Sequence, residues 1–242
     1  MNLCIDQGNS STKIAVFDQN KLIDQFTYEF FELNALLNVL EKYDLQACIL
    51  SSVRSENVEL IRELENTFST FIQLSNKTLI PIENLYKTPE TLGKDRLAAV
   101  IGAAYLKPET DILVVDAGTA ITYDFIDSKN KYHGGNIAPG INLRLRSLHE
   151  FTQKLPLVAA QAETPFLGID TNSAILSGAI YGIVFEIDGY INTLKIKYPK
   201  LSIFLTGGST FYFDNKLKST IFVEKNLVLI GLNRILQYNV QK

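Results

Sequence analysis

The sequence predicts an α/β fold built from two similar halves. Apolar segments with the short length of strands alternate with segments whose apolar residues recur at helical spacing. An apolar strand, an Asp-x-Gly turn and a returning strand occur twice in the chain. The 242 residues are 46% hydrophobic and 20% charged, which supports a large buried core and excludes a disordered chain. At ~150 residues per domain, this length corresponds to between one and two domains.

Each element of the first half follows from a local pattern. Gly, Asn and Ser at 8–11 are typical turn formers, so the apolar segments on either side of them form a hairpin. Apolar side chains at helical spacing predict helices, and the Ala-rich segment at 97–106 has so few polar positions that it must be buried. We expect strands at 3–5, 12–17, 21–29 and 47–53, and helices at 35–43, 56–66 and 97–106.

The second half begins after a boundary at residues 107–110 (Lys-Pro-Glu-Thr), which predicts domains at 1–108 and 109–242. A strand, a Gly turn and a second strand share residues 112–127, and the Gly/Pro-rich segment GGNIAPG at 134–140 predicts a loop. Later elements are a long apolar helix that follows Gly168 to Gly178, a strand at 201–208 that ends in Gly-Gly, and a helix at 226–238.

The two strand–turn–strand segments indicate a duplication. When Asp6 is aligned with Asp116, LCIDQGNSSTKIAVFD matches LVVDAGTAITYDFID, and Thr12 falls on Thr122. A repeat at about 110 residues is typical of a duplicated domain and not of a solenoid. A cleft between two such halves would be a preferred ligand site.

Composition and missing motifs exclude several function classes. The 23 basic and 26 acidic residues give a net charge of −3, which argues against nucleic acid or anionic membrane as a partner. The start MNLCIDQGN lacks signal-peptide features, and the apolar runs are too short for a membrane span, so we expect a soluble cytoplasmic protein. Walker A, GxGxxG, HExxH and GxSxG motifs are absent from the sequence. Cys4 and Cys48 are expected to be buried, and His133 and His149 to lie on the surface.

Three segments have side chains suited to phosphate chemistry. In the Asp-x-Gly turns, glycine lets an anion approach the peptide N–H groups, and Asp6 or Asp116 can hold a cation. Before the Ala-rich helix, Asp95 can accept a proton beside Arg96, although it can equally be a helix-capping residue. LTGG at 205–208 allows a close approach of backbone to a base or sugar, or is an ordinary turn.

Together these segments resemble the type III pantothenate kinases, over essentially the whole chain. The Gly-x-Asp-Arg and DAGTA segments distinguish that family most sharply from its relatives. The shared motifs are Asp6-x-Gly8-Asn9-Ser10 with Lys13, Tyr86-x-x-Pro89, Gly93-x-Asp95-Arg96, Asp116-x-Gly118-Thr119-Ala120, GGNIAPG at 134–140, Leu155-Pro156, Gly168-x-x-Thr171 with Ser177-Gly178, and Thr206-Gly207-Gly208.

The resemblance implies two ribonuclease-H-like halves of the actin-like ATPase fold, each a mixed five-stranded sheet flanked by helices. It implies transfer of the γ-phosphoryl group of ATP to the primary alcohol of pantothenate, the first step of coenzyme A biosynthesis. Asp95 would be the catalytic base, Mg²⁺ would accompany ATP, and Asp116 would hold K⁺ or NH₄⁺. The implied ATP-binding residues are Asp6, Gln7, Gly8, Asn9, Ser10, Ser11, Thr12, Lys13 and Thr119, and the implied pantothenate-binding residues are Tyr86, Gly93, Lys94, Asp95, Arg96 and Thr171.

Helix 174–195 is apolar well beyond one face, and the resembled family is dimeric, so we expect a homodimer. Three alternatives remain: another small-molecule kinase of this fold, a non-catalytic regulator of transcription, and a nucleotide-dependent binding module. Arg96 argues against a neutral sugar as substrate, and the retained Asp95 and Asp116 argue against a silent regulator. A binding module would need a substrate domain, for which the sequence has no room.

Overall fold

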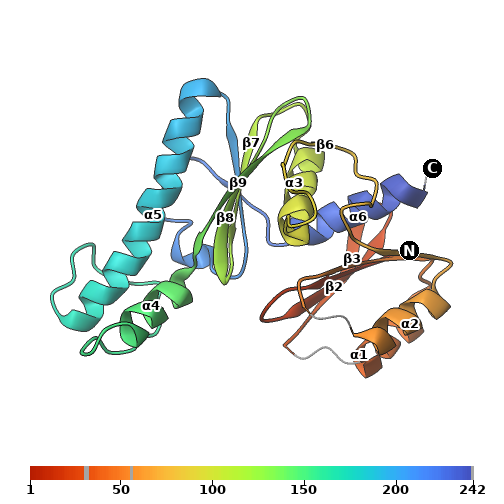
Figure 1. Ribbon diagram of the computed structural model, residues 1–242, viewed down its shortest axis with the longest axis horizontal. Coiled ribbons are helices and arrows are strands. Elements are labelled where there is room, and N and C mark those ends of the chain that lie inside the picture. Colours follow the sequence, from red (N-terminus) through yellow and green to blue (C-terminus); the bar gives the residue numbers. More distant parts are fainter. Residues whose placement is uncertain (30–32, 55–56, 241–242) are drawn as a thin grey trace. The chain divides into compact units, whose positions relative to one another are not determined.

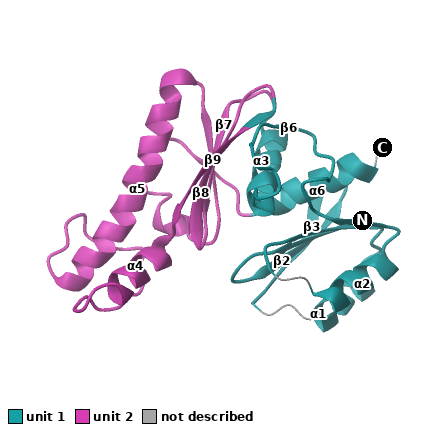
Figure 2. Cartoon of the chain, viewed as in Figure 1, with its two compact units in different colours: residues 1–108, 130–132, 226–242 teal, residues 109–129, 133–225 magenta. Residues whose placement is uncertain are grey.

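The computed structural model describes residues 1–29, 33–54 and 57–240 (Figure 1). Figure 2 shows that the chain forms two compact units. Unit 1 comprises Met1–Pro108, Asn130–Tyr132 and Asn226–Lys242, and unit 2 comprises Glu109–Lys129 and His133–Lys225. The C-terminal helix therefore groups with the first half, whereas the sequence division at residue 108 places it in the second. The physical reason is that this helix packs against the Ala-rich helix of unit 1.

Unit 1 contains a five-stranded sheet with the strand order β3-β2-β1-β4-β5. Leu36, Val39, Leu60 and Leu64 of helices α1 and α2 pack into one core with buried side chains of β1, β2 and β4. The expected second helix begins at residue 56, which lies outside the described residues. The elements are β1 (Asn2–Gln7), β2 (Thr12–Asp18), β3 (Lys21–Tyr28), α1 (Leu33–Lys42), β4 (Ala47–Ser52), α2 (Val58–Thr67), β5 (Thr70–Gln73), α3 (Lys94–Leu106) and α6 (Leu227–Val240).

Helices α3 and α6 cross closely because glycines lie at the crossing (Figure 1). A Cβ atom at Gly231 would lie 1.8 Å from the carbonyl oxygen of Ala98, and one at Gly102 would lie 2.3 Å from that of Leu227. This packing buries most of α3 from Arg96 to Ala103. The expectation of a buried Ala-rich helix is confirmed.

Unit 2 contributes most of a sheet with the order β11-β10-β7-β8-β9-β6. In both sheets the strand that ends at the Asp-x-Gly turn pairs with an antiparallel strand on one side and a parallel strand on the other. The order β9-β8-β7-β10-β11 repeats the order β3-β2-β1-β4-β5, which agrees with the duplication inferred from sequence, while β6 makes the second sheet six-stranded where five strands were expected. The elements are β6 (Glu83–Asn84), β7 (Ile112–Ala117), β8 (Ala120–Ile126), β9 (Lys131–Pro139), α4 (Ile141–Glu150), α5 (Thr171–Lys197), β10 (Ser202–Thr206), the short 3₁₀ helix η1 (Thr210–Tyr212) and β11 (Phe222–Val223).

The Gly/Pro-rich segment 134–140 is not the loop that its composition predicts, since β9 runs as far as Pro139. Its glycines serve close backbone packing. A Cβ atom at Gly135 would lie 1.9 Å from the carbonyl oxygen of Tyr123 on the neighbouring strand, and Gly134 has a φ of 100°. Glycine inside a strand commonly marks such a close approach.

Helix α5 is a core element of unit 2. Its side chains Ile180, Ile183, Ile187 and Ile191 pack with β7, β8 and β10. Among the described residues, α5 is the one helix that is long enough and apolar enough to span a membrane. However, 56% of its most apolar 18-residue segment is buried inside the protein. Burial of this kind is typical of a central helix in a globular domain.

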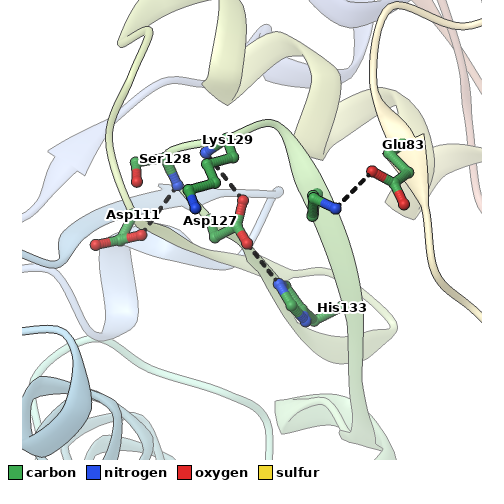
Figure 3. Close-up of polar contacts among 7 residues, drawn as sticks. Glu83, Asp111, Asp127, Ser128, Lys129 and His133 are labelled. Carbon is green, nitrogen blue, oxygen red and sulfur yellow. Dashed lines mark hydrogen bonds and ion pairs between the residues drawn. The ribbon is translucent and has the colours of Figure 1, made fainter.

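Polar contacts fix the turn between β8 and β9 (Figure 3). Nε2 of His133 lies 2.8 Å from Oδ2 of Asp127, and the backbone N–H of Ser128 donates to Asp111 at 2.9 Å. Lys131 forms an ion pair with Glu83 at 2.9 Å. His133 is thus a partly exposed strand residue with a carboxylate partner, consistent with the surface position expected for it.

Candidate functional site

The β1–β2 hairpin places the first Asp-x-Gly motif at the end of the sheet in unit 1. Asp6 and Gln7 are the last two residues of β1, and the turn closes through a hydrogen bond from the Gly8 N–H to the Ser11 carbonyl at 3.0 Å. Asn9 and Ser10 are exposed at the tip of this turn. The turn therefore presents small polar side chains and backbone N–H groups to solvent, the arrangement that suits a phosphate.

Asp6 lies in the middle of a charged neighbourhood. It pairs with Lys13 on β2 and with Ser51 on β4. Burial and, to a smaller extent, the negative charge of Asp95 raise the pKa of Asp6 to about 6, against the opposing effect of Lys13. The fold thus brings together two carboxylates and a lysine that are far apart in the sequence.

One hydroxyl beside this turn lacks a partner among the described residues. Thr12, opposite Gln7 in the β1–β2 register, is fully buried, and its Oγ1 atom makes no hydrogen bond there. Thr122, the equivalent residue of the second hairpin, is half-buried, and its Oγ1 atom is likewise enclosed without a hydrogen-bond partner among the described residues. A buried polar atom without a partner is costly, so each of these hydroxyls is suited to bind a group that the chain itself does not supply.

Arg54 is a site residue that the sequence analysis missed. Its Nε atom donates to the Gly8 carbonyl at 2.6 Å, and its Nη2 atom lies 3.4 Å from the Asn9 carbonyl. The available signal was its position: β4 runs parallel to β1, so a basic residue just after β4 reaches the same edge of the sheet as the turn. Arg54 holds the backbone of the turn in place.

Helix α3 begins beside Asp6. Its N-cap is Gly93, which has no side chain to form a capping bond, and Asp95 is in the first turn, where Oδ1 accepts a hydrogen bond from the Arg96 N–H at 2.8 Å. Asp95 is therefore not the N-cap residue, but it does lie in the first turn as an N-terminal acid. A Cβ atom at residue 93 would lie 2.6 Å from Oδ1 of Asp95, so glycine there leaves room for the carboxylate.

The other predicted substrate residues of unit 1 form an aromatic and cationic cluster. The guanidinium group of Arg96, a residue only 5% exposed, lies over the ring of Tyr86 at 5.6 Å. Tyr86 stacks in turn on the buried Tyr132, with ring centroids 6.3 Å apart. Lys94 and Pro89 line a small adjacent cavity of about 30 Å³, room for roughly one water molecule.

The second Asp-x-Gly turn has an equivalent arrangement in unit 2. Asp116 lies between Thr122 on β8 and Thr206 on β10. Gly207 follows with a φ of 97°, and a Cβ atom there would lie 2.4 Å from Oδ1 of Asp116, so glycine is required for both conformation and space. Thr119 is exposed at the turn, and its carbonyl accepts a hydrogen bond from the Gly140 N–H at 3.0 Å.

These residues fit a cation that is completed by ligands from outside the protein. Among the described residues there is no group of three or more His, Cys, Asp or Glu side chains able to enclose a metal ion. Mg²⁺ is usually held by one or two carboxylates together with phosphate oxygens and waters. Asp6 in unit 1 and Asp116 in unit 2 each match that kind of partial coordination.

Thr171 stands apart from the other predicted residues of unit 2. It is exposed in the first turn of α5, whose N-terminus is capped by Asp170 and Ser173. Within the described part of the chain, no hydrogen bond or ion pair joins Thr171 to Asp116 or Thr119.

Comparison with known proteins gives a consistent result. A family model described as type III pantothenate kinase matches residues 2–193. The chain is 50% identical over 239 residues to a type III pantothenate kinase from Phocaeicola vulgatus, covering 99% of each protein. Two solved structures cover nearly the whole chain. The first is described as a Baf family transcriptional activator from Campylobacter jejuni; it aligns with a TM-score of 0.67 and 24% identity, over 99% of this chain and 100% of that chain. The second is described as an N-acetylmannosamine kinase from Listeria monocytogenes; it aligns with a TM-score of 0.57 and 16% identity, over 98% of this chain and 99% of that chain. These two similarities concern the fold alone, and they confirm the actin-like, sugar-kinase type of architecture.

Proposed function

The chain belongs to the type III pantothenate kinase family, and on this premise we propose how its own residues carry out the reaction. That reaction is the ATP-dependent phosphorylation of pantothenate, in the biosynthesis of coenzyme A. The observation that supports the proposal most strongly is that the carboxylates of Asp6 and Asp95 lie near enough to repel each other. Two carboxylates close enough to raise the pKa of one of them are suited to divide cation binding and base catalysis between them.

We assign Asp6 and the β1–β2 turn to ATP and its Mg²⁺. A cation beside Asp6 would offset the burial of its carboxylate and the repulsion from Asp95, and so favour the ionised form of Asp6. Lys13 adds positive charge, and the N–H groups and side chains of the turn accommodate the phosphate oxygens. When bound, Mg²⁺ offsets the negative charge that accumulates on the transferring phosphoryl group. The turn residues in this role are Gln7, Gly8, Asn9, Ser10, Ser11 and Thr12, and Thr119 is a further residue that we assign to ATP.

Asp95 accepts the proton of the pantothenate hydroxyl as that oxygen attacks the γ-phosphorus. A primary alcohol is a poor nucleophile until a carboxylate within hydrogen-bonding reach takes its proton. Asp95 lies in the first turn of α3, where its Oδ1 accepts the Arg96 N–H and its position is fixed. The bond from the γ-phosphorus to the attacking oxygen forms while the bond to the leaving oxygen of ADP breaks.

Arg96 binds the carboxylate of pantothenate. Its guanidinium group is placed by stacking on Tyr86, and a planar guanidinium offers paired donors that match a carboxylate. Gly93 and Lys94 complete this segment of the pantothenate site. Thr171 contributes from the start of α5, in its own subunit or a second one.

Asp116 holds a monovalent cation, K⁺ or NH₄⁺. One Mg²⁺–ATP complex does not require a second carboxylate of this kind, and a large monovalent ion suits one carboxylate with hydroxyl and carbonyl oxygens better than a second Mg²⁺ does. The unpartnered Thr122 hydroxyl and the close approach of Gly207 support a site of that type.

The active form is a cytoplasmic homodimer formed through α5. The rings of Phe166, Tyr181 and Phe185 pack edge to face or tilted on its outer side, with Phe185 54% exposed. Leu167 and Ile169, 74% and 90% exposed, continue this apolar patch toward the helix start. Contiguous exposed apolar surface of this kind usually marks an interface.

The function is tested by measuring ADP release with and without pantothenate. We expect turnover that depends on pantothenate, and none with N-acetylmannosamine as the acceptor. Turnover of the sugar in preference to pantothenate, or ADP release that ignores the acceptor, would overturn the proposal.

A further inference from the structure

Unit 1 contains a second pocket, which the reaction described above does not use. Its volume is about 320 Å³, within the lower range of small-molecule sites. The pocket lies at the C-terminal half of α3, where Ile101, Ala104 and Tyr105 form one wall. At 1.5 Å per residue, this wall is roughly 9–15 Å along the helix from Asp95, so the pocket is separate from the catalytic end of α3.

The pocket contains a single positioned cation, Arg234 of α6. The guanidinium group of Arg234 lies over the ring of Tyr105 at 5.5 Å, which orients it without neutralising its charge. Within the part of the chain that the structure describes, no acidic side chain lies within 4.0 Å of this guanidinium. A half-buried arginine held in this way presents two parallel donors for an anion.

The remaining walls are apolar apart from one residue. Pro81, Ile82 and Pro108 line the pocket together with the α3 side chains. The exception is Asn130, at the β8–β9 turn. This turn is fixed by the hydrogen bond from the Glu83 N–H to the Asn130 carbonyl at 2.9 Å and by the ion pair of Glu83 with the neighbouring residue Lys131 (Figure 3).

From these features we propose that the pocket binds a small monocarboxylate with an apolar body. One guanidinium group matches one carboxylate in charge and in geometry, whereas a phosphate dianion would be left only partly neutralised. The apolar walls remove a hydrocarbon chain from water, and the Tyr105 ring borders the anionic end. The ligand would thus be recognised at the opposite end of α3 from the catalytic carboxylate.

Isothermal titration calorimetry of the full-length protein with octanoate tests this inference. We expect saturable binding to one site per chain, weakened at least ~10-fold by Arg234→Gln, since a hydrogen bond to a charged group contributes about this factor. Ala104→Phe, which fills the pocket, should abolish binding. The matched control is Arg146→Gln, an exposed arginine of unit 2, which should bind octanoate as the wild type does.

Pantothenate kinase activity and circular dichroism establish that each variant is folded, because neither Arg234 nor Ala104 belongs to the catalytic machinery. Octanol, which has the same chain without the charge, should bind as weakly to the wild type as octanoate binds to Arg234→Gln. Absence of saturable octanoate binding up to about 5 mM, or equal affinity in the wild type and a folded Arg234→Gln variant, would overturn the inference.

Discussion

Replacing Asp6 with asparagine should stabilise the ligand-free protein while removing its activity. Burial and the charge of Asp95 raise the pKa of Asp6 from 3.8 to about 6, so the ionised side chain destabilises the fold at neutral pH. One pKa unit corresponds to about 1.4 kcal/mol, which gives an upper limit of roughly 3 kcal/mol. This pKa already includes the favourable charge of Lys13, and Asn keeps part of the desolvation cost of a buried polar group, so we expect a net gain of about 1–3 kcal/mol.

The sign of this effect depends on pH. Below pH ~3 Asp6 is protonated in both the folded and the unfolded chain and costs nothing. As pH rises through about 6, the unfolded chain ionises first, and the stability present at low pH is lost. The variant lacks this titration, so its advantage should be absent below pH ~3, grow between pH ~4 and ~6, and be complete above pH ~7.

Thermal unfolding followed by circular dichroism measures the difference. In a chain of this size about 1 kcal/mol moves Tm by roughly 2–4 °C, so Asp6→Asn should unfold about 2–12 °C above the wild type at neutral pH. Mg²⁺–ATP should then raise the Tm of the wild type but not of the variant. The control is Asp18→Asn, an exposed residue at the far end of β2, which should not change Tm. A variant equal to or less stable than the wild type at neutral pH would refute this reasoning.

Three further outcomes follow from the proposed site. Turnover by the wild type should fall at least ~10-fold when Na⁺ replaces K⁺ and NH₄⁺, whereas Asp116→Asn should be slow in every salt. Equal wild-type rates in Na⁺ and K⁺ would contradict the assignment of a monovalent cation to Asp116. Arg54→Gln should raise KM for ATP about 5–10-fold and leave KM for pantothenate unchanged, because the substitution loosens only the β1–β2 turn. An unchanged KM for ATP would contradict the role of Arg54 in positioning this turn. Phe185→Asp should convert a dimer into monomers in light scattering, while Val58→Asp on α2 should not, and a monomeric wild type at micromolar concentration would contradict the interface.

The local parts of the fold could be predicted from the sequence. Each hairpin is formed by one continuous segment that contains an apolar strand, an aspartate, a glycine turn and a returning strand. Burial of α3 followed from its composition alone. The resemblance to a known family added the roles of residues such as Asp95, which the pattern alone could assign equally to a helix cap.

The missed features depend on contacts between distant segments. The glycines of β9 signal a loop by composition, and only the nearby Tyr123 carbonyl explains why a strand needs them. Arg54 reaches the Gly8 carbonyl because β4 lies beside β1, a pairing that no local pattern contains. Helix α6 packs on α3 through Gly231, although its position late in the chain suggested the second half.

The most direct test of the account is the kinetics of Asp95→Asn. Asparagine keeps the shape of the side chain but cannot accept the hydroxyl proton, so kcat should fall by about 10²–10⁴-fold. KM for ATP should change little, because the phosphates are assigned to the turn at Asp6. Since Gly93 and not Asp95 caps α3, the variant should remain folded. A folded variant that turns over within about threefold of the wild type would contradict the assignment of Asp95 as the base.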